Sequence, residues 1–424
     1  MSAFDKVIGY GSIKKELMQI VDMIRNKEMY SKLGAKLPHG AMLVGDPGLG
    51  KTLMTNCFIE ESGLKTLTIR KDRSNGEFLN RITEVFEKAK ENEPCIIFLD
   101  DLDKFANEDD DHRDAEEYVA VQAGIDEVKD HEVFVIATVN DPHKLPDSLK
   151  RSGRFDRIIK VGCPSHKDAE QIIDHYLSDK KISKDVNRED LAKMITYSSC
   201  AELETILNEA AINAAYERKD SIGINDLVKV ILGRQYPNSG DFSTDSTSDE
   251  EIRKTALHEA GHLVVSEALL PGSVGFASIK PLGKDTVGGF IHRCENTSRR
   301  THDILISLAG KAAVELYYAE TVANGCQVDI RRAGREIANG LTGNATRGFP
   351  SIEIPGLGSE SLDFRNDTAL KIMMEEYFLQ ARNILIKNRG FLEAVTEALV
   401  KKETLLYSDI REIREKFEIV KVAV

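Results

Sequence analysis

One short segment constrains the fold of this chain more than any other, because it prescribes a strand, a loop and a helix in that order. The apolar run 41–44 is followed by Gly45-Asp46-Pro47-Gly48-Leu49-Gly50-Lys51-Thr52 and then by a stretch with helical character. Glycines in such a loop turn backbone N–H groups toward phosphate oxygens, the lysine reaches the β- and γ-phosphates, and the threonine hydroxyl ligates Mg²⁺. The strand–loop–helix context favours an ATP-binding loop over a chance glycine-rich turn.

Further short apolar runs predict the strands of a parallel sheet around this loop. They are separated by amphipathic segments that fit crossover helices, and they lie at 67–69, 95–99, 133–137 and 158–161. Asp100 and Asp101 follow the run 95–99, so Asp100 is expected to hold Mg²⁺ through water and Asp101 to position the attacking water. Asn140 ends a neighbouring strand and is expected to contact the γ-phosphate or that water.

The remainder of the chain reads as mainly helical. Residues 167–232 carry helical periodicity, which predicts a small helical subdomain after the sheet. Residues 234–249 are polar, with Pro and Gly, and form the best linker in the chain. Two strand-like pieces, 276–281 and 287–292, interrupt the helical pattern beyond it.

A second motif, His258-Glu259-Ala260-Gly261-His262, predicts a metal site on a helix. Histidines four residues apart lie on one helix face, one turn apart, and two nitrogens at that spacing bind one Zn²⁺. Glu259 follows the first histidine directly, so its carboxylate can take a proton from a zinc-bound water. An ordinary helix with two matching histidines is the alternative, but the complete motif with apolar flanks favours zinc.

A catalytic zinc takes a third protein ligand and keeps an open position. The candidates are acidic residues and histidines on later segments, and spacing leaves the choice open among Glu315, Glu320, Asp329, His292 and His302.

Composition excludes several classes of protein. The net charge of -13 argues against a general nucleic-acid binder, which would carry a basic face. The 6 cysteines have no paired spacing, which indicates buried thiols in a reducing compartment. No run of about 18 apolar residues is present, so no membrane segment is expected and a cytoplasmic location is predicted.

With these motifs in place, residues 4–233 resemble the AAA+ ATPases, and among them the FtsH-type AAA+ metalloproteases. The resemblance gives Ile8 and Gly9 an adenine contact and makes Asn140 a sensor residue. Arg154 and Arg157 match paired arginine fingers that act across a subunit interface, whereas the sequence alone would suggest surface salt bridges. The resemblance therefore implies a ring, most simply a homo-hexamer, because a finger supplied by a neighbour requires one.

The C-terminal half carries the same resemblance. The segment 325–333 is similar to the family stretch whose aspartate is the third zinc ligand, which selects Asp329 over its alternative role as a helix N-cap. The segment 308–315 matches a stretch between the ligands, and 276–291 matches strands along which a peptide substrate could add. The resemblance implies an ATP-dependent zinc endopeptidase that degrades protein or peptide substrates, with Glu259 as the base.

The implied architecture has four parts. An α/β P-loop AAA+ core with a parallel sheet spans 1–165, and a helical lid follows over 166–233. The linker occupies 234–249, and a mainly α-helical zinc metalloprotease domain spans 250–424.

Three features depart from the family pattern. Asp101 stands where the family has Glu, which withdraws the carboxylate by about 1.5 Å and could slow hydrolysis on the order of a hundredfold. The segment 73–79 lacks the aromatic–hydrophobic–Gly triplet that grips substrate, and leaves Phe78 as a displaced gripper or a core residue. The usual N-terminal membrane segments are absent, which fits a naturally soluble relative or an excised piece of a longer protein.

These departures keep two other hypotheses open. One is a nucleotide-binding ring with weak or no ATP hydrolysis that acts as a regulator. The other is a peptidase of unfolded chains whose ATP site only assembles the ring.

Overall fold

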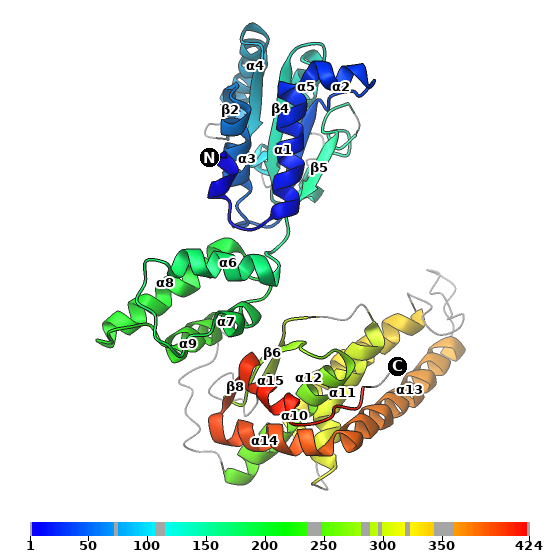
Figure 1. Cartoon of the computed structure of the whole chain (residues 1–424). Helices are drawn as coiled ribbons and strands as arrows, with labels where there is room; N and C mark the ends of the chain where they lie inside the picture. The colour runs from blue at the N-terminus through cyan, green and yellow to red at the C-terminus, as the bar shows by residue number, and fades with distance from the viewer. Residues whose placement is uncertain are drawn as a thin grey trace. The chain divides into compact units, whose positions relative to one another are not determined.

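The computed structural model describes residues 2–71, 75–106, 115–151, 153–235, 248–280, 289–295, 299–318, 323–342 and 360–421. The chain divides into two compact units (Figure 1). The first comprises Met1–Lys180 and Tyr197–Glu209, and the second comprises Lys181–Thr196 and Ala210–Val424.

A five-stranded parallel sheet organises the first unit, as the apolar runs predict. Its order is β2-β3-β4-β1-β5, and the strands are β1 (Gly40–Val44), β2 (Lys65–Ile69), β3 (Cys95–Leu99), β4 (Val133–Val139) and β5 (Arg157–Lys160). Strands β1, β3 and β4 are buried along their whole length, which is why they read as continuous apolar runs without alternation. Because β4 lies between β1 and β3, residues that follow β4 lie between the two predicted halves of the nucleotide site.

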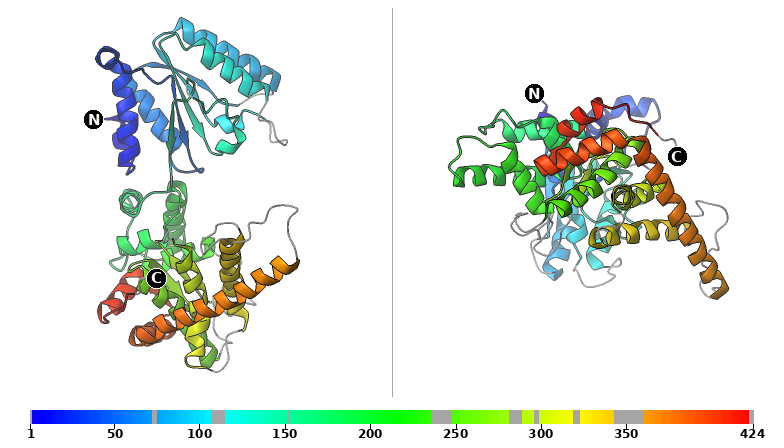
Figure 2. Two further views of the ribbon diagram at one scale, coloured as in Figure 1. Left: turned by 90° about the vertical axis from the view of Figure 1, so that its right-hand side faces the viewer. Right: turned by 90° about the horizontal axis from the view of Figure 1, so that it is seen from below.

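Helices cover both faces of this sheet, as the left view of Figure 2 shows. On one face, α4 (Asn75–Glu91) and α5 (Glu116–Glu127) pack on the alternate residues of β1, β3 and β4. On the other, Phe58 of α3 (Lys51–Ser62) lies against Phe134, with ring centroids 5.6 Å apart. The other helices between Met1 and Lys180 are α1 (Gly11–Arg25), α2 (Lys27–Lys32), α6 (His166–Leu177) and the short helices η1 (Ala3–Lys6), η2 (Leu102–Lys104) and η3 (Pro142–Lys144).

A single buried helix, α10 (Asp249–Leu269), forms the centre of the second unit. It starts with a capping box between Ser248 and Glu251, and every residue from Thr255 to Ala268 is buried. The helices around it belong to one apolar core, and the helices of this part are α11 (Arg300–Glu315), α12 (Ala323–Thr342), α13 (Glu360–Lys387), α14 (Arg389–Lys402) and α15 (Tyr407–Glu415).

A three-stranded antiparallel sheet completes this unit, in the order β7-β6-β8. Strands β6 (Val274–Ser278) and β7 (Phe290–Arg293) match the two predicted pieces, although 281–288 lie outside the described residues. The third strand, β8 (Thr404–Leu406), was not predicted, because three residues are too few to show a strand period. Both edges of β6 are paired, with β7 and with β8, whereas β7 is an edge strand of the sheet. The expectation that a peptide adds along 276–291 therefore stays a prediction, with β7 as the strand that has an outer edge.

The predicted lid is helical, with α7 (Arg188–Met194), α8 (Cys200–Tyr216) and α9 (Ile224–Gln235) following α6. It does not form a unit of its own, however. Within the second unit, Asp190 of α7 accepts hydrogen bonds of 2.7 Å from both the backbone N–H and the hydroxyl of Ser408 on α15. The domain limits at 165, 233 and 249 therefore stay predictions, and most of the proposed linker, 236–247, lies outside the described residues.

No helix in the described part of the chain combines the length and the apolar character that crossing a membrane requires.

Candidate functional site

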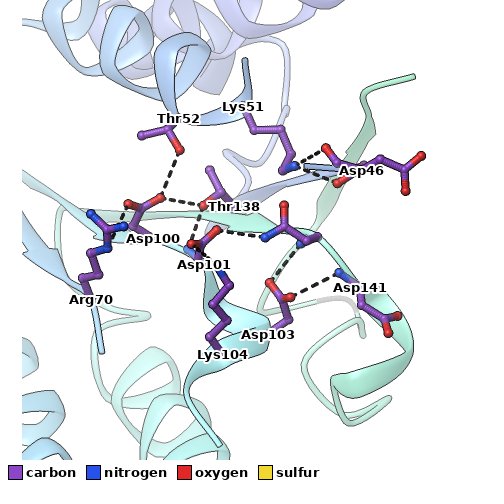
Figure 3. A network of polar contacts seen from close by, with 12 residues as sticks. Asp46, Lys51, Thr52, Arg70, Asp100, Asp101, Asp103, Lys104, Thr138 and Asp141 are labelled. Atoms are coloured by element: carbon purple, nitrogen blue, oxygen red, sulfur yellow. Dashed lines mark hydrogen bonds and ion pairs between the residues drawn. The ribbon is translucent and has the colours of Figure 1, made fainter. Parts of the chain in front are cut away.

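The glycine-rich loop joins β1 to α3, and two of its carbonyl groups bind the side chain of Lys51. Gly48 and Gly50 have φ of 80° and 82°, values that favour glycine. At Gly45 a Cβ atom would lie 2.0 Å from the carbonyl oxygen of Val161, so no side chain fits there. Lys51 Nζ donates to the carbonyl oxygens of Gly45 and Asp46, each at 2.7 Å (Figure 3). Burial lowers the pKa of Lys51, and these two carbonyls hold the ammonium over the loop.

Asp100 lies beside the loop and connects it to β4. Its Oδ1 accepts a hydrogen bond of 3.2 Å from the Thr52 hydroxyl and one of 2.9 Å from the Thr138 hydroxyl (Figure 3). Arg70 Nε lies 3.9 Å from the other carboxylate oxygen. The threonine and aspartate expected to hold Mg²⁺ are thus brought together, and this oxygen-rich set is the kind that Mg²⁺ prefers.

Three hydrogen bonds hold Asp101. Its backbone adopts a left-handed conformation with φ of 54°, and its N–H donates to the Thr138 hydroxyl at 2.9 Å. Its carboxylate accepts from Lys104 Nζ at 2.7 Å and from Asn140 Nδ2 at 3.0 Å (Figure 3). Partial burial alone would raise the pKa of Asp101, but the bond and charge of Lys104, with the bond from Asn140, outweigh it and lower this pKa. The second carboxylate therefore stays ionised in a fixed orientation.

Asp103 positions the backbone at Asn140, and the sequence analysis did not select Asp103. Its carboxylate accepts the backbone N–H groups of Asn140 at 2.9 Å and of Asp141 at 3.3 Å. Thr138 and Lys104 were likewise missed, although both lie within two or three residues of a predicted site residue. The sequence feature that could have identified these three residues is their position, since all are polar and lie near the ends of β3 and β4.

The entry segment turns sharply at Gly9. This residue has φ of 71°, and a Cβ there would lie 2.7 Å from an oxygen of Asp168, whose carboxylate also accepts the N–H of Tyr10. Ile8 is half-buried next to this turn. The adenine contact assigned to Ile8 and Gly9 stays a prediction.

The two arginines expected to act as fingers lie in different environments. Arg154 makes a two-point ion pair with Asp126 on α5, at 2.7 and 3.2 Å, and also donates to Gln122 and to the carbonyl of Ser148. The hydrogen bond from Arg154 lowers the pKa of Asp126 to about 2. Arg157 is exposed on β5, and its side chain has no ion-pair partner within the described ranges.

The expectation that Phe78 grips a substrate chain is wrong. Its side chain is fully buried and packs edge to face on Phe105, with centroids 4.9 Å apart. Residues 72–74, which precede it, lie outside the described residues. Phe78 is therefore a core residue, the second of its two predicted roles.

Three side chains form a metal-ligand cluster between α10 and α12. His258 Nε2 and His262 Nε2 are 3.0 Å apart, and each lies 3.2 Å from Asp329 Oδ2. Four ligands at about 2.0 Å around zinc would have edges of about 3.3 Å, so this triangle fits a tetrahedral ion with one open position. Asp329 lies inside α12, which begins at Ala323, so its alternative role as an N-cap is wrong.

The groups around the three side chains also favour metal binding. His262 Nδ1 lies 2.6 Å from the carbonyl oxygen of Ile306, which directs Nε2 toward the cluster. Burial would lower the pKa of His262, but the hydrogen bond and charge of Asp329 outweigh it and raise this pKa to about 9. Burial would raise the pKa of Asp329, and the bonds from both histidines lower it instead. The Asp329 carboxylate thus favours a positive charge on the histidine nitrogens, and a bound dication would supply that charge in place of protons.

Two glycines make room for these ligands. A Cβ at Gly261 would lie 2.6 Å from the carbonyl oxygen of Ala309, so α10 and α11 approach closely there. A Cβ at Gly310 would lie 2.5 Å from both His258 Cε1 and His262 Nε2. No sequence pattern selects Gly310, because its importance comes from its proximity to the histidines of another helix.

Glu259 is buried beside the cluster. Burial raises its pKa, opposed by the charges of His258 and His262, and the N–H of Gly289 donates to its carboxylate. A carboxylate whose pKa is raised accepts a proton readily, which suits a general base.

The other ligand candidates do not join this group. Glu315 is ion-paired with Lys311, four residues away on α11. His292 stacks on Phe276, and burial lowers its pKa to about 4. His302 is buried with no hydrogen-bond partner for either ring nitrogen among the described residues. Glu320 lies outside the described residues.

Comparison with known proteins gives relatives for both halves. Residues 41–163 match the ATPase family associated with various cellular activities (AAA). The chain is 32% identical to an ATP-dependent zinc metalloprotease FtsH of Leptotrichia buccalis over 97% of its own length and 56% of that protein. It is 30% identical to the FtsH 3 of Symbiobacterium thermophilum and to the FtsH 1 of Alkaliphilus metalliredigens, covering 71% and 74% of those proteins. The similarity therefore spans the nucleotide residues and the metal cluster together.

Proposed function

This chain belongs to the family of ATP-dependent zinc metalloproteases named FtsH, and from that premise we propose that it is a zinc endopeptidase that degrades protein substrates with the help of ATP. The observation that carries the proposal is the cluster of buried His258 and His262 with half-buried Asp329, and with the buried Glu259 beside it. The phosphate loop and the two carboxylates after β3 support the ATP-dependent part.

The chain's own residues define the peptidase chemistry. A zinc ion bound by His258, His262 and Asp329 would polarise a water molecule and the substrate carbonyl. Glu259 takes the proton of that water and later gives it to the leaving amine, and its burial keeps bulk water from competing for this proton. Gly289 holds the Glu259 carboxylate in place through its backbone N–H.

The nucleotide residues have equally distinct roles. Lys51 leaves its two loop carbonyls to bind the phosphates, and Thr52 and Asp100 hold Mg²⁺. Asp101 orients the attacking water, with Asn140 beside it. Arg157, exposed on β5, is the arginine available to reach the nucleotide of a neighbouring subunit in a ring.

The Glu259→Gln substitution tests the peptidase. The amide cannot accept the proton, so we expect degradation of an unfolded protein such as casein to fall at least a hundredfold. ATP hydrolysis and zinc content should stay at wild-type values. Glu250→Gln, on the exposed first turn of the same helix, serves as the matched control and should degrade casein normally. Degradation that survives Glu259→Gln would remove Glu259 from the mechanism.

One observation favours a second candidate, a nucleotide-binding ring with little ATP turnover. Both oxygens of the short Asp101 carboxylate are already bonded within the chain, to Lys104 and Asn140. This candidate predicts tight ATP binding, slow hydrolysis and a rise in turnover of about tenfold or more for Asp101→Glu. Brisk hydrolysis by the wild type would eliminate it.

Degradation of a short flexible peptide and of a folded protein, each with and without ATP, separates the candidates. The first proposal expects ATP to be needed for the folded protein. A ring that is only assembled by ATP would cleave the peptide and leave the folded protein intact. A regulator would cleave neither.

A further inference from the structure

The two histidines of the metal cluster are held from outside by different chemical groups. Each directs Nε2 inward, toward Asp329 Oδ2, which leaves Nδ1 on the far side of the ring. For His262 the group at Nδ1 is the carbonyl oxygen of Ile306, at 2.6 Å. For His258 it is the sulfur of Cys326, at 3.9 Å.

The position of Cys326 in the fold makes this contact specific. Cys326 and Asp329 are three residues apart on α12, so they lie on one face of that helix, one turn apart. Asp329 reaches the inner side of the His258 ring, and Cys326 reaches its outer side. The Cys326 side chain is buried, and its sulfur is not one of the atoms that form the metal-ligand cluster.

Helix α11 also lies close to this ring. A Cβ at Gly310 would lie 2.6 Å from His258 Nδ1 and 2.5 Å from its Cε1, so the ring has no room to move toward that helix. The imidazole is thus close to both the backbone of α11 and the sulfur on α12. These two contacts limit the orientations that the ring can adopt.

We propose that Cys326 is a positioning residue for His258, fixing its tautomer and ring orientation for metal binding. A histidine that binds a metal through Nε2 carries its proton on Nδ1, and this N–H needs an acceptor. Sulfur accepts such a bond weakly, so His258 is the more loosely fixed of the two histidines. The inference rests on the proposed zinc site and adds the residue that orients it.

Zinc affinity, measured by competition with a chromogenic chelator, tests this role without any protease assay. Loss of an outer partner of a metal ligand lowers affinity by about 10- to 100-fold. Because the sulfur bond is a weak one, we expect about a tenfold loss for Cys326→Ala. Cys326→Ser, which keeps an acceptor, should recover part of it. The Nδ1–H resonance of His258 in the zinc-loaded protein should shift in Cys326→Ala, which a loss of packing alone would not require.

Cys294→Ala is the matched control. Cys294 is a buried cysteine in the same unit, and its sulfur contacts the carbonyl oxygens of Gly272 and Ser273 rather than a metal ligand. We expect its zinc affinity to equal that of the wild type. Unchanged affinity in Cys326→Ala, or an equal loss in both variants, would overturn the positioning role. A wild type that binds zinc but degrades no protein would refute the proposed function while leaving this test intact.

Discussion

At the scale of single residues, the absence of a side chain decides as much as its presence. Gly310 and Gly334 are both glycines inside helices, α11 and α12, and the sequence gives them equal weight. The structure separates them, because a Cβ at Gly310 would lie 2.5 Å from both zinc-binding candidates, whereas one at Gly334 would meet nothing within 4 Å. The effect of a side chain at Gly334 therefore depends on helix propensity, whereas at Gly310 it depends on the metal cluster.

This contrast gives a paired prediction. Gly310→Ala should lower zinc affinity by about tenfold or more, because ligands displaced by more than about 0.5 Å lose their geometry. Gly334→Ala should leave zinc affinity unchanged and stabilise the protein by about 0.5–1 kcal/mol, since alanine favours a helix interior. Chelator competition and thermal unfolding measure the two effects. Equal zinc affinity in both variants would contradict the close packing at Gly310.

At the scale of elements, a few short strands connect residues that are far apart in the sequence. Strand β6 lies between β7 and β8, so Phe276 is opposite His292 on one side and Leu406 on the other. His292 is half-buried in this arrangement, with its ring stacked on Phe276 at a centroid distance of 5.1 Å, and its buried Nε2 has no hydrogen-bond partner in the described segments. Burying the imidazole in its neutral form makes β7 sensitive to acid.

The sign of this sensitivity follows from the pKa of His292. Burial lowers it from 6.5 to about 4, so the unfolded chain binds a proton below pH 6.5 that the folded chain does not. Stability is retained above pH 6.5 and falls as the pH drops from 6.5 toward 4. For one such histidine the loss between pH 7 and pH 5 is on the order of 1 to 2 kcal/mol.

His292→Phe keeps the aromatic packing and removes the titration, so it should flatten this part of the pH dependence. The measurement is the free energy of unfolding of zinc-free protein at pH 7 and pH 5. A variant that loses as much stability as the wild type would show that other groups cause the acid sensitivity.

At the scale of the whole molecule, nucleotide and metal residues belong to different compact units, and the arginines point to a further level of assembly. Arg154 is occupied within its own unit by Asp126 and Gln122, which leaves Arg157 as the exposed arginine of the pair. If the proposed ring forms, Arg157 acts on the nucleotide of the adjacent subunit and Arg154 maintains the loop that carries it.

Mixed assemblies test that division of roles. Arg157→Ala should lower ATP turnover by about a thousandfold or more, the range expected when an arginine finger is lost. Lys51→Ala should be inactive because its phosphate loop is defective. Rings mixed from both variants should regain turnover, because the intact loop of one meets the intact arginine of the other. Arg151→Ala, at an exposed position of the same segment, should stay active. Mixtures no more active than their components would contradict action between subunits.

The sequence by itself determined whatever depends on local spacing. Backbone periods place the apolar runs in strands, put Lys51 and Thr52 at the start of a helix, and set His258 and His262 one turn apart on α10. Family resemblance pointed to Asp329, and the structure places it beside both histidines, 71 residues from His258.

Only the tertiary structure decided which distant side chains meet. The order of strands placed the Thr138 hydroxyl between Asp100 and Asp101. Helix packing turned Phe78 into the core and gave Arg154 its partner on α5. It also brought Cys326 and Gly310 against His258. Such contacts depend on how complete elements pack, and packing is set by the summed burial of many side chains, which no short window of sequence contains.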